Sequence, residues 1–291
     1  MASSPILVIT GPTASGKTEF ALNFVRANPG VEIVNADASL IYRGFDIGTA
    51  KPSKEIRDEI PHHLIDILEP HEKFSAADYS KLARNAFRDI YARDKIPIVV
   101  GGTGFYIDAL FDGIAPIHVS DEDAASAKER YNHELKELGF DEMHERLREI
   151  DPILFAQIRR ERNPIRLERA WTHYYATGEP LGEARKRSGE KFEYRPKYNV
   201  RNLPRPELWE RIEERVDTMI ADGWMDEAKG LMDHGVTSDV PAMRAIGYRE
   251  MFDVLEGNIS IEEARELIIF HTRQYAKRQS TWMKKYISDQ P

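Results

Sequence analysis

The chain has 291 residues, of which 41% are hydrophobic and 31% charged, and it has a net charge of −8 and no cysteine. This length suggests one large domain or a core domain with an insertion. The lack of cysteine excludes disulfides, thiolate metal sites and a thiol nucleophile. No apolar run of about 18 residues occurs, so no membrane span is expected. Met1–Pro5 lacks the features of a secretory signal, and a cytoplasmic location is expected.

Three short apolar runs alternate with helical patterns in the first part of the chain. Ile6–Thr10, Val31–Ala36 and Ile96–Val100 are typical of buried strands. Apolar residues at helical spacing follow the first run at Phe20–Val25, and a helical pattern follows the third run through Leu110. This alternation predicts an α/β fold with a parallel sheet and a ligand site at the carboxyl ends of its strands.

A phosphate-binding motif, G-x-x-x-x-G-K-[ST], lies between the first predicted strand and the first predicted helix. Its glycines and the following helix N-terminus direct backbone N–H groups toward phosphate oxygens. We expect Lys17 to neutralise a diphosphate and Thr18 to bind Mg²⁺ through its hydroxyl. The predicted diphosphate-binding residues are Gly11, Pro12, Thr13, Ala14, Ser15, Gly16, Lys17 and Thr18. The motif alone does not choose between ATP, GTP and another diphosphate.

Asp37 and Thr103 follow the second and third predicted strands, so we expect them at the same sheet edge as the loop. A carboxylate there can hold Mg²⁺ through water or accept a proton from a substrate, and its alternative role is to cap a helix or turn. Thr103 follows Gly101-Gly102, and it presents a hydroxyl or caps the turn. Because the strand ends in glycines, it lacks the Walker B carboxylate of the usual NTPases.

From about Ser120 the strand patterns give way to charged helical patterns. Helices are predicted over Asp121–Leu138, Phe140–Ile150 and Pro164–Ala176. An irregular basic stretch is then expected as far as Pro206. This change of character indicates a helical insertion into the α/β core.

We place the inserted helical domain at residues 118–199, and the core at residues 1–117 and 200–291. Residues 159–205 carry thirteen basic and six acidic side chains, a local charge of +7 in an otherwise acidic protein. Such a segment is either a solvated helical face or a surface for nucleic acid.

The remaining aromatic and histidine residues are interpreted as structural. Amphipathic helices are predicted at Leu208–Ile220 and at about Ser260–Tyr286. Residues assigned to packing are Trp224, Met225, Tyr275, Trp282 and Tyr286. The pair His62-His63 lacks further ligands at metal spacing, so no metal site is assigned to it.

Taken together, several blocks of the sequence resemble the tRNA dimethylallyltransferase family. The blocks are Gly11–Thr18, Asp37–Tyr42, Arg43–Pro52, Pro61–Asp66, Phe74–Asp78, Val100–Thr103, Pro164–Ala170, Arg244–Arg249 and Thr272–Gln279. They follow the family order from about residue 6 to residue 286, which is nearly the full chain. Eukaryotic members often add a zinc-binding module, so the cysteine-free chain is similar to the bacterial type.

The resemblance implies a P-loop NTPase-like core that binds dimethylallyl diphosphate with Mg²⁺. The acceptor would be N6 of the adenosine on the 3′ side of the anticodon, extruded from its stack. The implied catalytic residues are Asp37, Thr103 and Arg211. Asp37 would be the general base for the N6 proton. Lys17 and Thr18, with Thr103 and Arg211, would hold the leaving diphosphate.

The resemblance also implies an interface with tRNA on a monomeric enzyme. The implied tRNA-binding residues are Asp37, Ala38, Ser39, Leu40, Ile165, Arg166, Leu167, Glu168, Arg169, Arg244, Ala245, Ile246, Gly247, Tyr248 and Arg249. The insertion would grip the anticodon stem through its phosphates, which makes affinity salt-dependent. Many members carry Asp-Ser-x-Gln where this chain has Ala38 and Leu40, so some base contacts are expected to differ.

Three other interpretations stay open. A P-loop kinase or ATPase would hydrolyse nucleotide or transfer phosphate, although the missing Walker B carboxylate opposes it. A prenyltransferase acting on free adenine nucleotides would not need the basic insertion. An RNA-binding protein without catalysis would not need the combination of Lys17, Thr18, Asp37 and Thr103.

Overall fold

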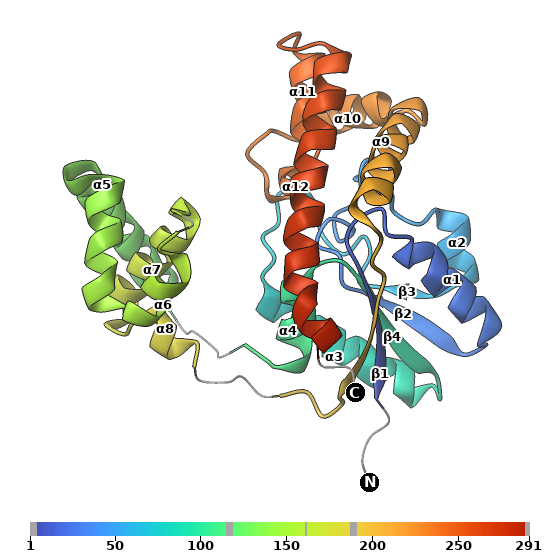
Figure 1. The fold of residues 1–291 in the computed structure, drawn as a ribbon, viewed down its shortest axis with the longest axis horizontal. Helices are drawn as coiled ribbons and strands as arrows, with labels where there is room; N and C mark the ends of the chain where they lie inside the picture. The colour runs from blue at the N-terminus through green and yellow to red at the C-terminus, as the bar shows by residue number, and fades with distance from the viewer. Residues whose placement is uncertain (1–4, 115–118, 161, 187–190, 289–291) are drawn as a thin grey trace. The chain divides into compact units, whose positions relative to one another are not determined.

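A computed structural model describes residues 5–114, 119–160, 162–186 and 191–288. The chain forms two compact units (Figure 1). The core unit comprises Met1–Phe111 and Phe192–Pro291, and the insertion unit comprises Asp112–Lys191. Among the described residues, no helix has the length and apolar character needed to cross a membrane.

The core unit is built on a five-stranded parallel sheet. Its strands are β1 Ile6–Thr10, β2 Val31–Asn35, β3 His62–His63, β4 Ile96–Gly101 and β5 Pro196–Val200, in the order β3-β2-β4-β1-β5. Val8 pairs with Val99 of β4 on one side and with Tyr198 of β5 on the other. The predicted α/β class with a parallel sheet is confirmed.

The prediction of an irregular stretch up to Pro206 is wrong, because β5 lies within it. β5 is an edge strand whose residues are half-buried or exposed. Because it contains polar side chains such as Lys197 and Asn199, it lacks the apolar run by which the other strands were predicted. The predicted division at 199/200 would separate β5 from the sheet, whereas the compact units divide between Lys191 and Phe192. The predicted division at 117/118 lies outside the described residues.

Helices cover both faces of the sheet. Helix α1 (Lys17–Ala27) packs its buried side chains against an apolar cluster that includes Ile9, Ile33 and Ile98. Because strand residues alternate between faces, their neighbours point to the other face, where α3 (Ala76–Ala92) contacts β2 and β4. Short helices α2 (Lys54–Glu59) and α4 (Gly104–Phe111) complete this part of the unit.

Four helices form the rest of the core unit, and α9, α10 and α11 lie beyond the carboxyl ends of the strands (Figure 1). They are α9 Arg205–Ala221, α10 Trp224–Asp233, α11 Tyr248–Leu255 and α12 Ile261–Ser288, with a 3₁₀ turn at Pro241–Arg244. All four contribute to one apolar cluster, in which Ile212 and Tyr248 are fully buried. Helices therefore cover the sheet edge at which the ligand site is expected.

The insertion unit is helical. It contains α5 Asp121–Ile150, α6 Pro152–Ile158, α7 Pro164–Thr177 and α8 Leu181–Ala184. Gly139 breaks α5 with φ 77° and ψ 166°, at the point where the sequence predicts the end of one helix and the start of the next. Met143, Leu167 and Trp171 are buried in its own apolar cluster.

Candidate functional site

A cavity of about 490 Å³ lies at the carboxyl ends of β1, β2 and β4 in the core unit. Thr13, Lys17 and Thr18 of the phosphate loop line it. Asp37 from the segment after β2 and Thr103 from the turn after β4 line it as well. The ends of parallel strands meet at one edge, so the prediction that these elements share one rim is confirmed.

The phosphate loop has the tight backbone that its glycines allow. Gly16 has φ 77°, in the left-handed region, and α1 begins at the next residue, Lys17. The Ser15 N–H donates to the Pro12 carbonyl at 3.3 Å, and the Lys17 Nζ lies 3.5 Å from the same oxygen. The loop thus wraps around the start of the helix, as the sequence predicts.

Gln279 of α12 anchors this loop to the neighbouring turn. Its Oε1 accepts from the Thr13 N–H at 2.8 Å, and its Nε2 donates to the Gly102 carbonyl at 2.9 Å. The side chain is only 5% exposed. Gln279 is the last residue of one of the blocks that resemble the family, but a single glutamine on a charged helix carries no local signal of this anchoring role.

Asp37 is half-buried at the cavity and held by local hydrogen bonds. Its N–H donates to Asn35 Oδ1 at 2.9 Å, and its own Oδ1 accepts from the Ser39 N–H at 3.0 Å. One carboxylate oxygen of Asp37 therefore caps its own turn, which is the alternative role expected from the sequence. The same bond fixes the orientation of the carboxylate in the cavity.

Thr103 connects the turn after β4 to the segment after β2. Its Oγ1 accepts from the Ala38 N–H at 3.0 Å, and its own N–H donates to the Ala36 carbonyl at 3.0 Å. A hydroxyl that accepts in this way keeps its proton for donation to another group. Thr103 therefore caps the turn, and its side chain is also hydrogen-bonded with that of Tyr275, which lines the cavity.

Two half-buried cations face this carboxylate from the loop and from α9. Loss of hydration lowers the pKa of Lys17 to about 8; Asp37 opposes this shift and Arg215 adds to it. Loss of hydration also lowers the pKa of Arg215, again against the effect of Asp37. One carboxylate for two cations leaves an excess of positive charge, which favours an anion such as a diphosphate.

Arg215 is the cavity arginine that the sequence analysis missed. The predicted Arg211 pairs with Glu207 at 3.0 Å and lies beside the phosphate loop, where a Cβ added to Gly16 would be 3.6 Å from its Nη1. Arg215, one turn further along α9, lines the cavity itself and donates to the Thr49 carbonyl at 3.3 Å. Arg215 lies four residues after Arg211 and therefore on the same face of α9, and this spacing was the sequence signal that could have identified it.

The rest of the cavity wall is largely apolar. One part comes from α9, α10 and α12 and consists of Ile212, Val216, Met219, Trp224 and Ile268. Another part is aromatic and consists of Tyr42, Phe74 and Tyr106. Trp224 is 1% exposed, so its assignment to the core is confirmed, yet one side of it also faces the cavity.

The predicted RNA-contacting residues of the core unit divide into three groups. Those that line the cavity are Asp37, Ala38, Ser39, Leu40, Arg244, Ala245 and Ile246. Gly247 and Tyr248 are buried behind it, and the Tyr248 hydroxyl donates to Glu227 Oε1 at 2.6 Å. Arg249 is exposed on the first turn of α11. The Tyr248 side chain thus serves the core and does not face the cavity.

The predicted RNA-contacting residues of the insertion unit lie on the first two turns of α7. Ile165 is 60% exposed and Arg169 is exposed, whereas Leu167 is fully buried in the apolar cluster of the unit. Glu168 pairs with Lys128. Burial lowers the pKa of Arg185, and the charges of Arg169 and Arg166 lower it further, which indicates a cluster of guanidinium groups. Arg187 of the basic segment lies outside the described residues.

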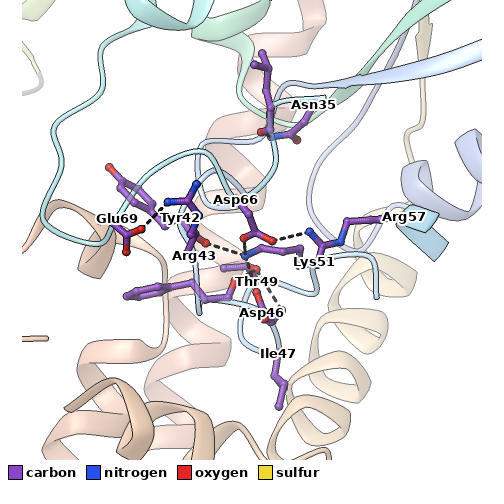
Figure 2. Close-up of polar contacts among 12 residues, drawn as sticks. Asn35, Tyr42, Arg43, Asp46, Ile47, Thr49, Lys51, Arg57, Asp66 and Glu69 are labelled. Carbon is purple, nitrogen blue, oxygen red and sulfur yellow. Dashed lines mark hydrogen bonds and ion pairs between the residues drawn. The ribbon is translucent and has the colours of Figure 1, made fainter. Parts of the chain in front are cut away.

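A buried lysine organises the segment between β2 and α2 (Figure 2). The Lys51 side chain is 1% exposed, and its Nζ donates to the Tyr42 carbonyl at 2.7 Å and pairs with Asp46 and Asp66. Asp66 also pairs with Arg57. These contacts fix the chain that brings Tyr42 and the residues before Lys51 to the cavity.

Glu227 of α10 holds the same segment from the other side. Its carboxylate accepts from the Asp46 N–H at 3.0 Å and from the Ile47 N–H at 2.7 Å, besides the Tyr248 hydroxyl. One side chain therefore ties α10 to two segments that lead into the cavity. Sequence patterns did not indicate this role, because the contacts join residues far apart in the chain.

The cavity offers oxygen ligands for Mg²⁺ from Thr18 and Asp37. Across the described residues, no cluster of three or more His, Cys, Asp or Glu side chains occurs that could hold a metal. Mg²⁺ bound with phosphates needs only one or two protein oxygens, so this donor set fits it. His63 Nε2 lies 2.7 Å from Glu32, and His62 Nδ1 lies 2.7 Å from the Ile60 carbonyl, so both have structural partners.

Several known proteins with similar sequences are named tRNA dimethylallyltransferase. A family model described as IPP transferase matches residues 40–286. The tRNA dimethylallyltransferase 1 of Pelobacter propionicus is 47% identical over 95% of this chain and 88% of its own length. The tRNA dimethylallyltransferase of Geobacter sulfurreducens is 41% identical over 96% and 89%.

Solved structures of similar fold are also named as transferases that act on tRNA. The tRNA isopentenylpyrophosphate transferase of Bacillus halodurans has a TM-score of 0.66 and 36% identity, over 97% of this chain and 87% of that one. A eukaryotic dimethylallyltransferase acting on tRNA has a TM-score of 0.78 and 26% identity, over 97% and 70%. With the family model matching most of its length, the chain belongs to the IPP transferase family.

Proposed function

We propose that this protein transfers the dimethylallyl group of dimethylallyl diphosphate to N6 of the tRNA adenosine on the 3′ side of the anticodon. The observation that carries the proposal is one cavity in which Asp37, Lys17 and Arg215 meet an apolar wall. The two cations suit a diphosphate, the wall suits a prenyl tail, and the carboxylate suits an amine that must lose a proton. The relatives named tRNA dimethylallyltransferase support the same substrates.

In the proposed reaction, N6 of the adenine attacks C1 of the donor as the C1–O bond breaks. Asp37 takes the N6 proton, and the products are N6-isopentenyladenosine and diphosphate. Lys17, Arg215 and the Thr103 hydroxyl stabilise the negative charge that develops on the leaving oxygen. The adenine reaches the cavity only when it is extruded from its stack.

Mg²⁺, held by Thr18, would add positive charge to the departing diphosphate. The chain's own contribution is the arrangement around it. Gln279 holds the phosphate loop and the turn of Gly102 at a fixed position relative to each other, and the Ser39 N–H holds the Asp37 carboxylate in place.

We place the contact with the anticodon stem in the insertion unit, through α7. The cytoplasmic location and monomeric state remain predictions.

The test is transfer of radiolabelled dimethylallyl diphosphate to unmodified tRNA, with Mg²⁺ and with AMP as a competing acceptor. Label in tRNA that disappears when the acceptor adenosine is replaced by guanosine supports the proposal. Label in AMP alone would move the function to free nucleotides. Hydrolysis of ATP or GTP without transfer to either acceptor would favour the kinase or ATPase interpretation.

A further inference from the structure

We infer that Trp224 limits the length of the prenyl donor, so that the cavity accepts a dimethylallyl tail and rejects tails one isoprene unit longer. The inference rests on the proposed function and names a residue that determines its donor specificity. It also changes the interpretation of Trp224, which the sequence assigns to packing alone.

A row of side chains on α9 leads from the phosphate loop toward Trp224. Arg211 lies beside Gly16, Arg215 lines the cavity one turn later, and Met219 lines it one turn after that. Residues four apart lie on the same helix face, and eight residues of helix span about 12 Å. The row therefore runs from the end that suits phosphate to an apolar end, where α10 begins with Trp224.

The wall along this row suits a hydrocarbon. Ile212, Val216 and Ile268 line it together with Met219, and all four are less than a tenth exposed. Val216 directly follows Arg215 on α9 and also lines the cavity, so the apolar part starts beside the cation. A donor with its diphosphate at Lys17 and Arg215 can therefore extend its tail along α9 without burying a polar group.

Another part of the cavity suits the acceptor base instead. Tyr42, Phe74 and Tyr106 form an aromatic wall there, and the ring of Tyr106 meets that of Phe74 edge-on at 6.2 Å. Leu40 and Arg244, which the family resemblance implies in RNA contact, line the cavity as well. A base that fills this part leaves the α9 wall as the direction for the prenyl tail.

Trp224 is held so firmly that a longer tail cannot displace it at low cost. A Cβ atom added to Gly48 would overlap the indole Nε1, and one added to Gly247 would overlap its Cη2. The ring also packs edge-on against Tyr248, with centroids 5.5 Å apart at 74°. Glu227, on the next turn of α10, binds both flanking segments. Extra atoms forced into such a packed wall would have to displace side chains and backbone, which weakens binding of the longer donor.

The test compares dimethylallyl and geranyl diphosphate as donors for tRNA in wild type and in Trp224→Leu. We expect the ratio of kcat/KM for geranyl over dimethylallyl to rise about 10–200-fold in the variant, and by less in Trp224→Phe. Trp209→Leu is the matched control, because Trp209 packs against the same apolar cluster without lining the cavity. Met251→Ala, at a fully buried position of that cluster, controls for lost stability. Both controls should keep the wild-type ratio.

An unchanged ratio in folded Trp224→Leu or Trp224→Phe would overturn the inference. Calorimetric binding of both diphosphates to wild type tests it without any variant, since geranyl diphosphate should bind at least about tenfold more weakly. Equal binding overturns the length limit even if dimethylallyl transfer to tRNA occurs. Preferential binding of dimethylallyl diphosphate without transfer to tRNA would support the limit and refute the proposed function.

Discussion

The core unit and the insertion unit use charged side chains differently. At the cavity of the core unit, Lys17, Asp37 and Arg215 are half-buried, and the charge of Asp37 opposes the lowering of the pKa of both cations by burial. In the insertion unit, the ion pairs lie on the helix surfaces, as with Arg146 and Glu142. Exposed pairs of this kind contribute about 0–1 kcal/mol each, because water screens them.

This difference suits the two units to two different tasks, RNA binding in the insertion unit and catalysis in the core unit. The insertion unit obtains its fold from apolar side chains such as Met143 and Trp171, so its surface charges are available to meet a partner. At the cavity of the core unit, Asp37 and Arg215 are held by hydrogen bonds to the backbone, so a change at either residue should alter the chemistry. Changes at the cavity should therefore affect catalysis, whereas changes on α7 should affect RNA affinity.

The largest effect is expected for Asp37→Ala. Loss of the proton acceptor should lower the rate of transfer to tRNA by about 10²–10⁴-fold, the usual contribution of a general base. Binding of tRNA, measured by filter retention, should change little. Asp37→Asn is the control, because it retains an oxygen for the Ser39 N–H and should be as inactive. Near-normal turnover in either variant would refute the base assignment.

Lys51→Met tests the scaffold of the same unit. Without the Lys51 ammonium, the buried Tyr42 carbonyl loses its donor and Asp46 and Asp66 lose a shared partner, although Asp66 keeps Arg57. We expect the free energy of unfolding in urea to fall by about 1–3 kcal/mol. Lys54→Met is the matched control, since Lys54 pairs with Asp58 at the exposed surface, where a loss of about 0–1 kcal/mol is expected. Equal losses would show that Lys51 does not organise the segment.

Sequence patterns predicted the parts of the fold that local order determines. The strands β1, β2 and β4 are apolar runs that end in glycine or polar residues, and their parallel pairing brings the loop, Asp37 and Thr103 to one edge. The break at Gly139 follows from a glycine inside a helical pattern. Each of these depends on a few neighbouring residues.

The missed parts depend on contacts between distant residues. Strand β5 lacks an apolar run, and only its pairing with β1 makes it a strand. Gln279 reaches the phosphate loop across more than 260 residues, and Glu227 reaches Ile47 across 180. Arg215 shares a helix face with the predicted Arg211, but only the fold shows that Arg215 is the one near Asp37. The cavity's supporting shell was therefore not predictable from local patterns.

Lys17 gives the core unit a dependence on pH. Its pKa is lowered to about 8, so the ammonium group is present below that pH and is lost as the pH rises through it. Affinity of the free protein for dimethylallyl diphosphate should therefore fall above about pH 8, by up to about tenfold per unit. Calorimetric titration across this range measures the fall. Lys17→Arg should remove the dependence, because a guanidinium stays charged. A wild-type affinity that is flat across this range would contradict the assignment.

The smallest effect is expected for Arg169→Glu in the insertion unit. Reversal of one exposed charge on α7 should weaken tRNA binding by about 1 kcal/mol. It should also lower the slope of log affinity against log salt by about 0.9 for each phosphate that the protein no longer neutralises. Affinity for dimethylallyl diphosphate should stay unchanged, since that ligand is assigned to the core unit.

Arg146→Glu is the matched control, because Arg146 is an exposed residue of the insertion unit that pairs with Glu142. This variant should leave both affinities near wild type. Equal losses for tRNA and diphosphate in Arg169→Glu would mean that the two units do not divide binding and chemistry between them.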